Sequence, residues 1–182
     1  AYRSDATSSA AVAGWGSGPA PGGPATRQVF VWEIAQPDPF LAVHLVSALA
    51  DGTPALQGAS EPDISRDGMQ IAFTSPSTDL VPAVYPTCST DCPSQVFVLE
   101  RDSDRDGKVS VGDNRTVQLV SKASNVEPAT AGTAPSYQPS ISADGQLVAF
   151  VTKATNLLLI EPASIGGGVD GDLLLGEVRR GE

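Results

Sequence analysis

Gln95-Val-Phe-Val-Leu-Glu-Arg101 is the stretch that decides the fold of this chain, because the sequence contains it more than once. It matches Gln28-Val-Phe-Val-Trp-Glu-Ile34 closely and Asp172-Leu-Leu-Leu-Gly-Glu-Val178 more weakly. The copies follow one another at a period of about 70 residues. A unit repeated at a period of tens of residues cannot bury its apolar side alone, so neighbouring units must stack on one another. We therefore expect a tandem array.

A second repeated stretch surrounds the first one. Glu61-Pro-Asp-Ile-Ser-Arg-Asp-Gly-Met-Gln-Ile-Ala-Phe73 returns as Gln138-Pro-Ser-Ile-Ser-Ala-Asp-Gly-Gln-Leu-Val-Ala-Phe150. An Asp-Gly pair between two apolar runs predicts a hairpin with a tight primed turn, since Gly tolerates the positive φ that such a turn needs. A further apolar run follows the Gln-Val-Phe-Val strand in two units, as Val43-His-Leu-Val-Ser47 and Thr116-Val-Gln-Leu-Val-Ser121. Each unit is thus expected to be a four-stranded antiparallel sheet, and the fold class all-β.

These residues resemble a known family. The pattern Pro-x-Ile-Ser-x-Asp-Gly-x-x-(Val/Ile)-Ala-Phe, followed by Ser77-Thr-Asp-Leu80 and by Ala154-Thr-Asn-Leu157, is similar to the TolB-like β-propeller repeat of secreted and envelope proteins. The resemblance implies four-stranded blades arranged radially. It implies a fold more than an activity, because the family hosts binding, scaffolding and enzyme-accessory roles alike.

The repeats also predict the organisation of the chain. We expect a single β-propeller segment over residues 1–182, with a partial blade at 1–60 that contains a Gly/Pro-rich insertion at 14–24, a full blade at 61–137 and a partial blade at 138–182. This makes about two and a half blades, incomplete at both ends, whereas propellers usually have at least four. Either the chain is a piece of a longer protein, or identical copies complete one another's blades by strand exchange.

One stretch carries recognisable chemistry, Asp102-Ser-Asp-Arg-Asp-Gly-Lys-Val-Ser-Val-Gly-Asp113. Oxygen ligands at alternate positions, a glycine for the sharp turn and a closing carboxylate reproduce the spacing of EF-hand-like and dockerin-like calcium loops. The predicted Ca²⁺ ligands are Asp102, Asp104, Asp106, Lys108 (through its backbone carbonyl), Ser110 and Asp113. A closing Asp instead of a bidentate Glu, between strands instead of helices, indicates a stapled loop of modest affinity, about 10⁻⁴ to 10⁻³ M. The alternative is a solvated acidic loop without metal.

The two cysteines, Cys88 and Cys92, are the only ones in the chain. Because one His and no further Cys are present to complete a zinc site, a local disulfide is the leading interpretation, and two free thiols are the alternative. A disulfide implies an oxidising compartment, so we expect a secreted protein, extracellular or in the cell envelope. No apolar run approaches the roughly 18 residues of a membrane span.

Composition restricts the partners. A net charge of −10 makes nucleic acid and anionic membrane surfaces poor partners, because both need basic patches. The 41% of hydrophobic residues suffices for a core, while 18 Gly and 15 Pro favour turns over helices. The expected partners are identical copies or the remaining blades of a longer chain.

Catalytic interpretations find little support. His44, the only histidine, lies on an apolar strand, and the chain has no Gly-x-Ser-x-Gly elbow for a hydrolase triad. Glu33, Glu100 and Glu177 could be considered as carboxylates for glycoside chemistry, but they occupy the same place in three repeats, which indicates a structural role. Trp32 stands where the next copy has Leu99, so we expect it to be packed.

The sequence therefore predicts a non-catalytic, extracellular, calcium-binding β-propeller module with a structural or protein-interaction role. One form of that role is the repeating subunit of an extracellular assembly or filament. The alternative is an accessory propeller domain of a larger secreted hydrolase or envelope protein.

Overall fold

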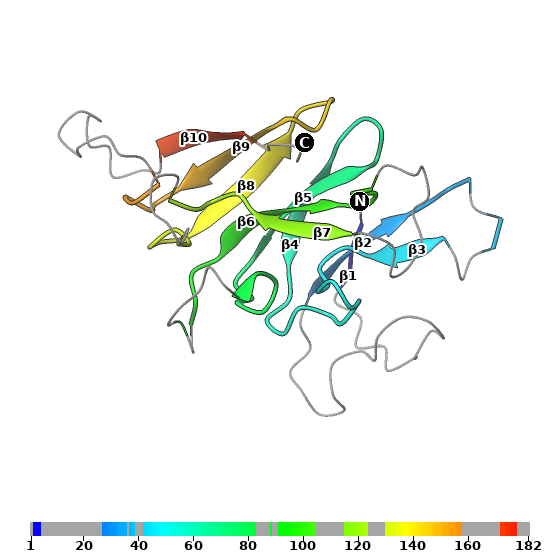
Figure 1. Cartoon of the computed structure of the whole chain (residues 1–182), viewed down its shortest axis with the longest axis horizontal. Helices are drawn as coiled ribbons and strands as arrows, with labels where there is room; N and C mark the ends of the chain where they lie inside the picture. Colours follow the sequence, from blue (N-terminus) through cyan, green and yellow to red (C-terminus); the bar gives the residue numbers. More distant parts are fainter. Residues whose placement is uncertain are drawn as a thin grey trace.

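The computed structural model describes residues 2–4, 27–35, 37–38, 42–82, 88, 91–104, 115–123, 130–157 and 172–177, and for 2–4 and 172–177 it describes the backbone alone. Ten strands form three antiparallel sheets, and the described residues contain no α-helix (Figure 1). The first sheet consists of β1 (Tyr2–Ser4), β2 (Gln28–Trp32) and β3 (Val43–Leu45). The middle sheet consists of β4 (Ser60–Ile64), β5 (Gln70–Ser75), β6 (Gln95–Glu100) and β7 (Thr116–Leu119). The third sheet consists of β8 (Ser136–Ile141), β9 (Leu147–Thr152) and β10 (Asp172–Glu177).

The strand pairings follow one register in all three sheets. The equivalent pairs are Tyr2 with Phe30, Phe73 with Phe97, and Phe150 with Leu174. The expectation of an all-β chain built from antiparallel sheets is confirmed. In the described residues the middle sheet has four strands and each of its neighbours has three. The arrangement of these sheets as propeller blades stays a prediction.

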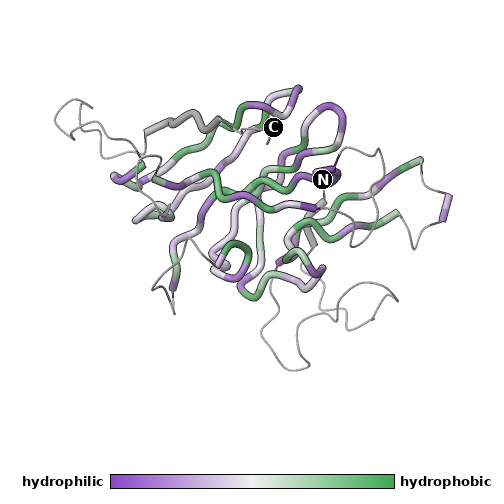
Figure 2. The backbone as a smooth tube through the Cα atoms, viewed as in Figure 1, coloured by the Kyte–Doolittle hydropathy of each residue, from purple (hydrophilic) through white to green (hydrophobic). Residues whose placement is uncertain are grey.

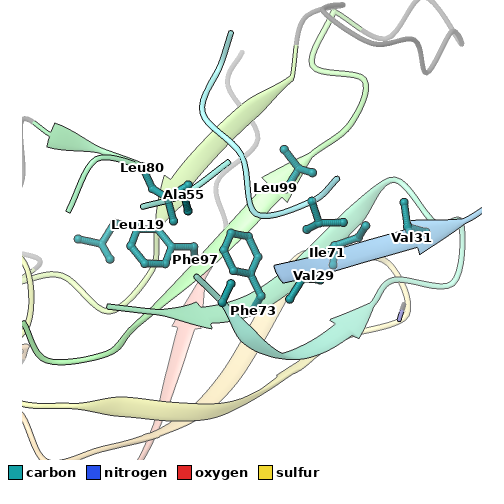
Figure 3. Close-up of a cluster of buried hydrophobic side chains, with 11 residues drawn as sticks. Val29, Val31, Ala55, Ile71, Phe73, Leu80, Phe97, Leu99 and Leu119 are labelled. Carbon is teal, nitrogen blue, oxygen red and sulfur yellow. The ribbon is translucent and has the colours of Figure 1, made fainter. Parts of the chain in front are cut away.

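The middle sheet is buried on both faces. Because side chains alternate along a strand, Phe73 and Phe97 point to one face and Ala72 and Val96 to the other. The first face packs on the first sheet in a cluster of eleven buried residues, of which Figure 3 labels nine; their members are Val29, Val31, Val46, Ala55, Ala59, Ile71, Phe73, Leu80, Phe97, Leu99 and Leu119. The second face packs on the third sheet through Ala72, Val96, Val98, Ile141, Val148, Phe150 and Leu157. Figure 2 shows that apolar residues are concentrated in the strands.

The predicted Asp-Gly hairpin is present, but its turn is longer than expected. Ser65 and Gln70 close the hairpin through a backbone bond of 2.9 Å, and Gly68 N donates to Ser65 O at 3.0 Å. Gly68 has a φ of 75°, whereas Asp67 is not among the residues with positive φ. The prediction of a primed two-residue turn is therefore wrong here. The Asp67 carboxylate accepts from Ser65 Oγ at 2.6 Å and from Met69 N at 3.1 Å, and these bonds stabilise the four-residue loop.

The turn between β8 and β9 repeats this arrangement. Asp144 accepts from Ser142 Oγ at 2.5 Å and from Gln146 N at 3.1 Å, and Gly145 has a φ of 70°. One difference separates the two turns. A Cβ added to Gly145 would lie 1.4 Å from Oε1 of Gln70 in the middle sheet, whereas a Cβ on Gly68 would meet nothing closer than 4.0 Å.

Gly145→Ala is therefore expected to cost more stability than Gly68→Ala. Both substitutions place an alanine at positive φ, which costs about 1–2 kcal/mol. Gly145→Ala must also displace the amide of Gln70, which is 2% exposed, so its total cost should reach about 2–4 kcal/mol. Chemical denaturation of the two variants measures the difference.

A double substitution provides the control. Gln70→Ala in the Gly145→Ala background removes the clashing amide and should recover part of the loss, while it should recover nothing in the Gly68→Ala background. Equal costs of Gly145→Ala and Gly68→Ala would contradict the close contact between the two sheets.

The first strands of the middle and third sheets are tied together by polar contacts. Glu61 and Gln138 both have positive φ, 52° and 53°, at equivalent irregularities of register in β4 and β8. Glu61 Oε2 accepts from Gln138 N at 2.7 Å, and Asp63 Oδ2 accepts from Ile141 N at 2.8 Å. Main-chain donors that would otherwise lack a strand partner are thus satisfied by carboxylates of the neighbouring sheet.

Candidate calcium loop and the contacts that anchor it

The predicted calcium loop connects β6 with β7. Glu100 and Thr116 form the last strand pair before it. Of the six predicted ligands the structure describes two, the half-buried Asp102 and the exposed Asp104. The other four, Asp106, Lys108, Ser110 and Asp113, lie outside the described residues. Among the residues that are described, no group of three His, Cys, Asp or Glu is placed to hold a metal ion, so calcium binding stays a prediction.

Arg101 anchors the loop where it leaves β6. Its side chain is 8% exposed, Nη1 donates to Gly68 O at 3.0 Å, and Nη2 forms an ion pair with Glu33 Oε1. Its backbone N–H also donates to Met69 O at 2.9 Å. Since Glu33 directly follows β2 of the first sheet, this ion pair joins the first and middle sheets.

Arg115 anchors the loop where it returns to β7. Nη1 donates to Leu45 O at 3.1 Å, and Nη2 donates to Val46 O at 2.9 Å and to Ala48 O at 3.4 Å. Burial, followed by the charge of Arg101, lowers the pKa of Arg115 from its ordinary value. Both ends of the loop are therefore fixed to the first sheet by arginines that lie near each other.

Positively charged side chains flank the acidic loop on both sides. Two guanidinium groups stand at its base, and four aspartates belong to its sequence. A cation bound by the loop, as the sequence predicts, would offset the repulsion among these carboxylates.

Glu33 and His44 form the second polar contact at this place. His44 Nε2 lies 3.4 Å from Glu33 Oε1, the oxygen that Arg101 also contacts. This glutamate holds together side chains from two sheets, which supports the structural interpretation of the repeated Glu.

The disulfide between Cys88 and Cys92 is present, as predicted, with the two Cα atoms 5.6 Å apart. It lies in the connection between β5 and β6, and Cys92 is buried. Closing such a short loop is expected to stabilise the fold by about 2 kcal/mol.

Sequence reasoning missed a buried glutamine–serine pair in the middle sheet. Gln95 is fully buried, and its amide nitrogen donates to Gly132 O at 3.0 Å and to Ala134 O at 3.2 Å. Its Oε1 accepts from Ser121 Oγ at 2.6 Å, and the same hydroxyl accepts from Val96 N at 2.9 Å. The pair thus provides hydrogen-bond partners for two loop carbonyls and for a main-chain N–H of β6, and the two side chains also bond to each other.

The first sheet contains the same pair. Gln28 donates to Ala55 O at 3.0 Å and accepts from Ser47 Oγ at 2.5 Å, and Ser47 Oγ accepts from Val29 N at 2.9 Å. The sequence did contain a sign of this pair. A Gln begins both strong copies of the repeated strand, and a Val-Ser pair ends both of the apolar runs that follow it.

The repeated Ser-Thr-Asp-Leu and Ala-Thr-Asn-Leu stretches have a structural role too. Asp79 Oδ2 accepts from Leu56 N at 3.1 Å, and Asn156 Oδ1 accepts from Thr133 N at 2.9 Å. In the units of the middle and third sheets, a side-chain oxygen that follows the second strand thus accepts from the loop that precedes the first strand.

The expectation that Trp32 is packed is wrong. Trp32 is 59% exposed, whereas its counterpart Leu99 is 3% exposed. Leu99 points to the face of the middle sheet that the first sheet covers, and Trp32 points to the corresponding face of the first sheet, on which no described sheet packs.

Comparison of the chain with protein-family models, with curated proteins and with solved structures gave no match. No helix in the described part of the chain is long and apolar enough to cross a membrane.

Proposed function

We propose that this chain is a non-catalytic, extracellular module of β-propeller type with a structural and protein-interaction role, in which calcium rigidifies the loop at residues 102–113. The observation that carries the proposal is the middle sheet, which packs on both faces against neighbours built in the same register. Such serial packing is typical of repeat proteins that present a surface and stack units to build it.

The roles of the polar side chains support a structural function. Glu33 binds Arg101, and Glu61 and Asp63 accept main-chain N–H groups of the third sheet. Ser47 and Ser121 are buried partners of glutamines. Glu33, one of the carboxylates considered for catalysis, and these other polar side chains thus hold sheets and loops together.

The extracellular assignment is supported by the disulfide, which persists in oxidising compartments. A modest calcium affinity fits the same setting, because extracellular modules bind calcium at about 10⁻⁴–10⁻³ M. The ion would stabilise the loop whose two ends Arg101 and Arg115 attach to the first sheet.

Calcium is expected to raise the thermal stability of the chain. With Kd in that range, about 10 mM calcium stabilises the folded state by about 1.4–2.7 kcal/mol. For a chain of this length the melting temperature should rise by roughly 3–10 °C. Differential scanning calorimetry with calcium and with a chelator measures the shift, and hydrogen exchange should show the gain in protection at β6, β7 and residues 45–48, whose carbonyls Arg115 contacts.

Two variants control this experiment. Asp104→Ala combined with Asp106→Ala should abolish the calcium-dependent shift, because it removes two predicted ligands. Asp38→Ala removes an exposed carboxylate from the connection between β2 and β3 and should leave the shift unchanged. A melting temperature that is the same with calcium and with chelator would refute the calcium role.

A further inference from the structure

The outer face of the first sheet is apolar. Val29 and Val31 pack toward the middle sheet, so the alternate residues Phe30 and Trp32 lie on the opposite face. Val43 pairs with Trp32 and therefore shares that face. Trp32 is 59% exposed and Phe30 and Val43 are half-buried, whereas Leu45, which pairs with Phe30 on the same face, is buried.

In the middle sheet the equivalent face is covered. Phe97, Leu99 and Val117 stand in the register positions of Phe30, Trp32 and Val43. Phe97 and Leu99 are buried against the first sheet, and Val117 packs against the same cluster. The first sheet thus exposes the kind of surface that the middle sheet uses as an interface.

The outer face of the third sheet is apolar as well. Val148 and Phe150 pack toward the middle sheet, so Leu147, Ala149 and Val151 lie on the opposite face. Leu147 is 41% exposed, and the other two are half-buried. Their equivalents in the middle sheet, Gln70, Ala72 and Thr74, are at most 2% exposed.

The two outer faces are of different kinds and complement each other. At the interface between the first and middle sheets, a face with the valines Val29 and Val31 meets a face with the bulky side chains Phe73 and Phe97. At the interface between the middle and third sheets, a face with the valines Val96 and Val98 meets a face with the bulky Phe150. The first sheet leaves a bulky face open, and the third sheet leaves open the face equivalent to that of Ala72. Stacking the third sheet of one copy on the first sheet of another would continue the internal series.

From this complementarity we infer that the outer face of the third sheet binds the outer face of the first sheet of a second copy, head to tail. The inference rests on the proposed function, of which it names the partner. Phe30, Trp32, Val43, Leu147, Ala149 and Val151 carry no charge, and Glu177, which pairs with Leu147, is the one charged residue that the register places on either face. The chain as a whole carries a net charge of −10. Association is therefore opposed by general repulsion between copies and should strengthen with added salt. Since the two faces differ, the contact is heterologous and yields rings or open filaments.

Sedimentation velocity of the whole chain across a range of concentrations tests the inference. The wild type should form oligomers larger than dimers, more so at higher salt. Trp32→Glu or Leu147→Glu should each weaken association by about tenfold or more, because each replaces the most exposed apolar side chain of one face by a charge. Both residues are exposed in the single chain, so the variants should fold.

Mixing distinguishes head-to-tail docking from other contacts. Trp32→Glu retains the outer face of the third sheet, and Leu147→Glu retains the outer face of the first, so the mixture should form a one-to-one complex that neither variant forms alone. Leu56→Glu, at an exposed residue on a loop outside both faces, should associate like the wild type.

The outcomes separate the inference from the proposed function. A wild-type chain that stays monomeric at every concentration and salt, or a Trp32→Glu variant that associates normally, would overturn docking between copies. Calcium-dependent melting of the same samples reports on the proposed function independently, since it does not require association.

Discussion

Phe97→Ala is expected to lower the free energy of unfolding by about 3–5 kcal/mol, the range for removing a buried aromatic ring from a core. Phe97 is fully buried in β6, and its ring stacks on Phe73 with the centroids 5.7 Å apart (Figure 3). The substitution opens a cavity between the first and middle sheets. Because the strands that line it are held by pairing within their own sheets, we expect the cavity to close only in part. Urea denaturation followed by circular dichroism measures the loss.

Phe30→Ala is the matched control, because Phe30 holds the same position in the first sheet. It is half-buried and lies on the open face, so its removal should cost only about 1 kcal/mol in the single chain. Equal costs at the two positions would mean that the middle sheet is not covered by its neighbour as described.

Gln95→Leu is expected to destabilise the chain by about 3 kcal/mol, although leucine is apolar and of similar volume. The substitution leaves the carbonyl oxygens of Gly132 and Ala134 and the hydroxyl of Ser121 without the bonds that the Gln95 amide supplies. Buried polar groups that lose one partner keep the full cost of their desolvation.

Gln146→Leu gives the comparison for Gln95. Gln146 is exposed in the turn between β8 and β9, where its main-chain N–H makes the contact with Asp144, so the change should stay within about 0.5 kcal/mol. Denaturation midpoints of the two variants are compared, provided that their m-values are equal. The difference separates the loss of the buried amide from a general effect of adding leucine. A Gln95→Leu variant as stable as the wild type would contradict the bonding network.

The strands were predictable because their pattern is local and repeated. The return of Gln-Val-Phe-Val identified β2 and β6, and the Asp-Gly pairs located both hairpins. The form of the turn was not predictable from Asp-Gly alone. Asp67 forms a loop with Ser65 and Met69, so a serine two residues earlier decides the turn type.

The anchors of the candidate loop could not be predicted for a different reason. Arg115 binds carbonyls of residues about 70 positions earlier in the chain, and backbone carbonyls leave no mark in a sequence. The pairing of Arg101 with Glu33 likewise depends on how two sheets meet. By contrast, the sequence pattern that predicts calcium binding is local, so it could be recognised although most of the predicted ligands lie outside the described residues.

Trp32 is exposed although Leu99, at the equivalent position of the next repeat, is buried. Equivalent positions share a direction along the strand, but burial depends on what lies next to the sheet, and a unit at one side of a series has a neighbour on one face only.

Coverage of the middle sheet on both faces has a consequence for how the chain opens. In a serial stack, the stability of each unit is its own contribution plus one term for each interface it shares. In the described part of the chain the middle unit shares two interfaces and each of the others shares one. Under force or mild denaturant, the molecule should therefore fray inward from its flanks, and β5 and β6 should be the last strands to separate.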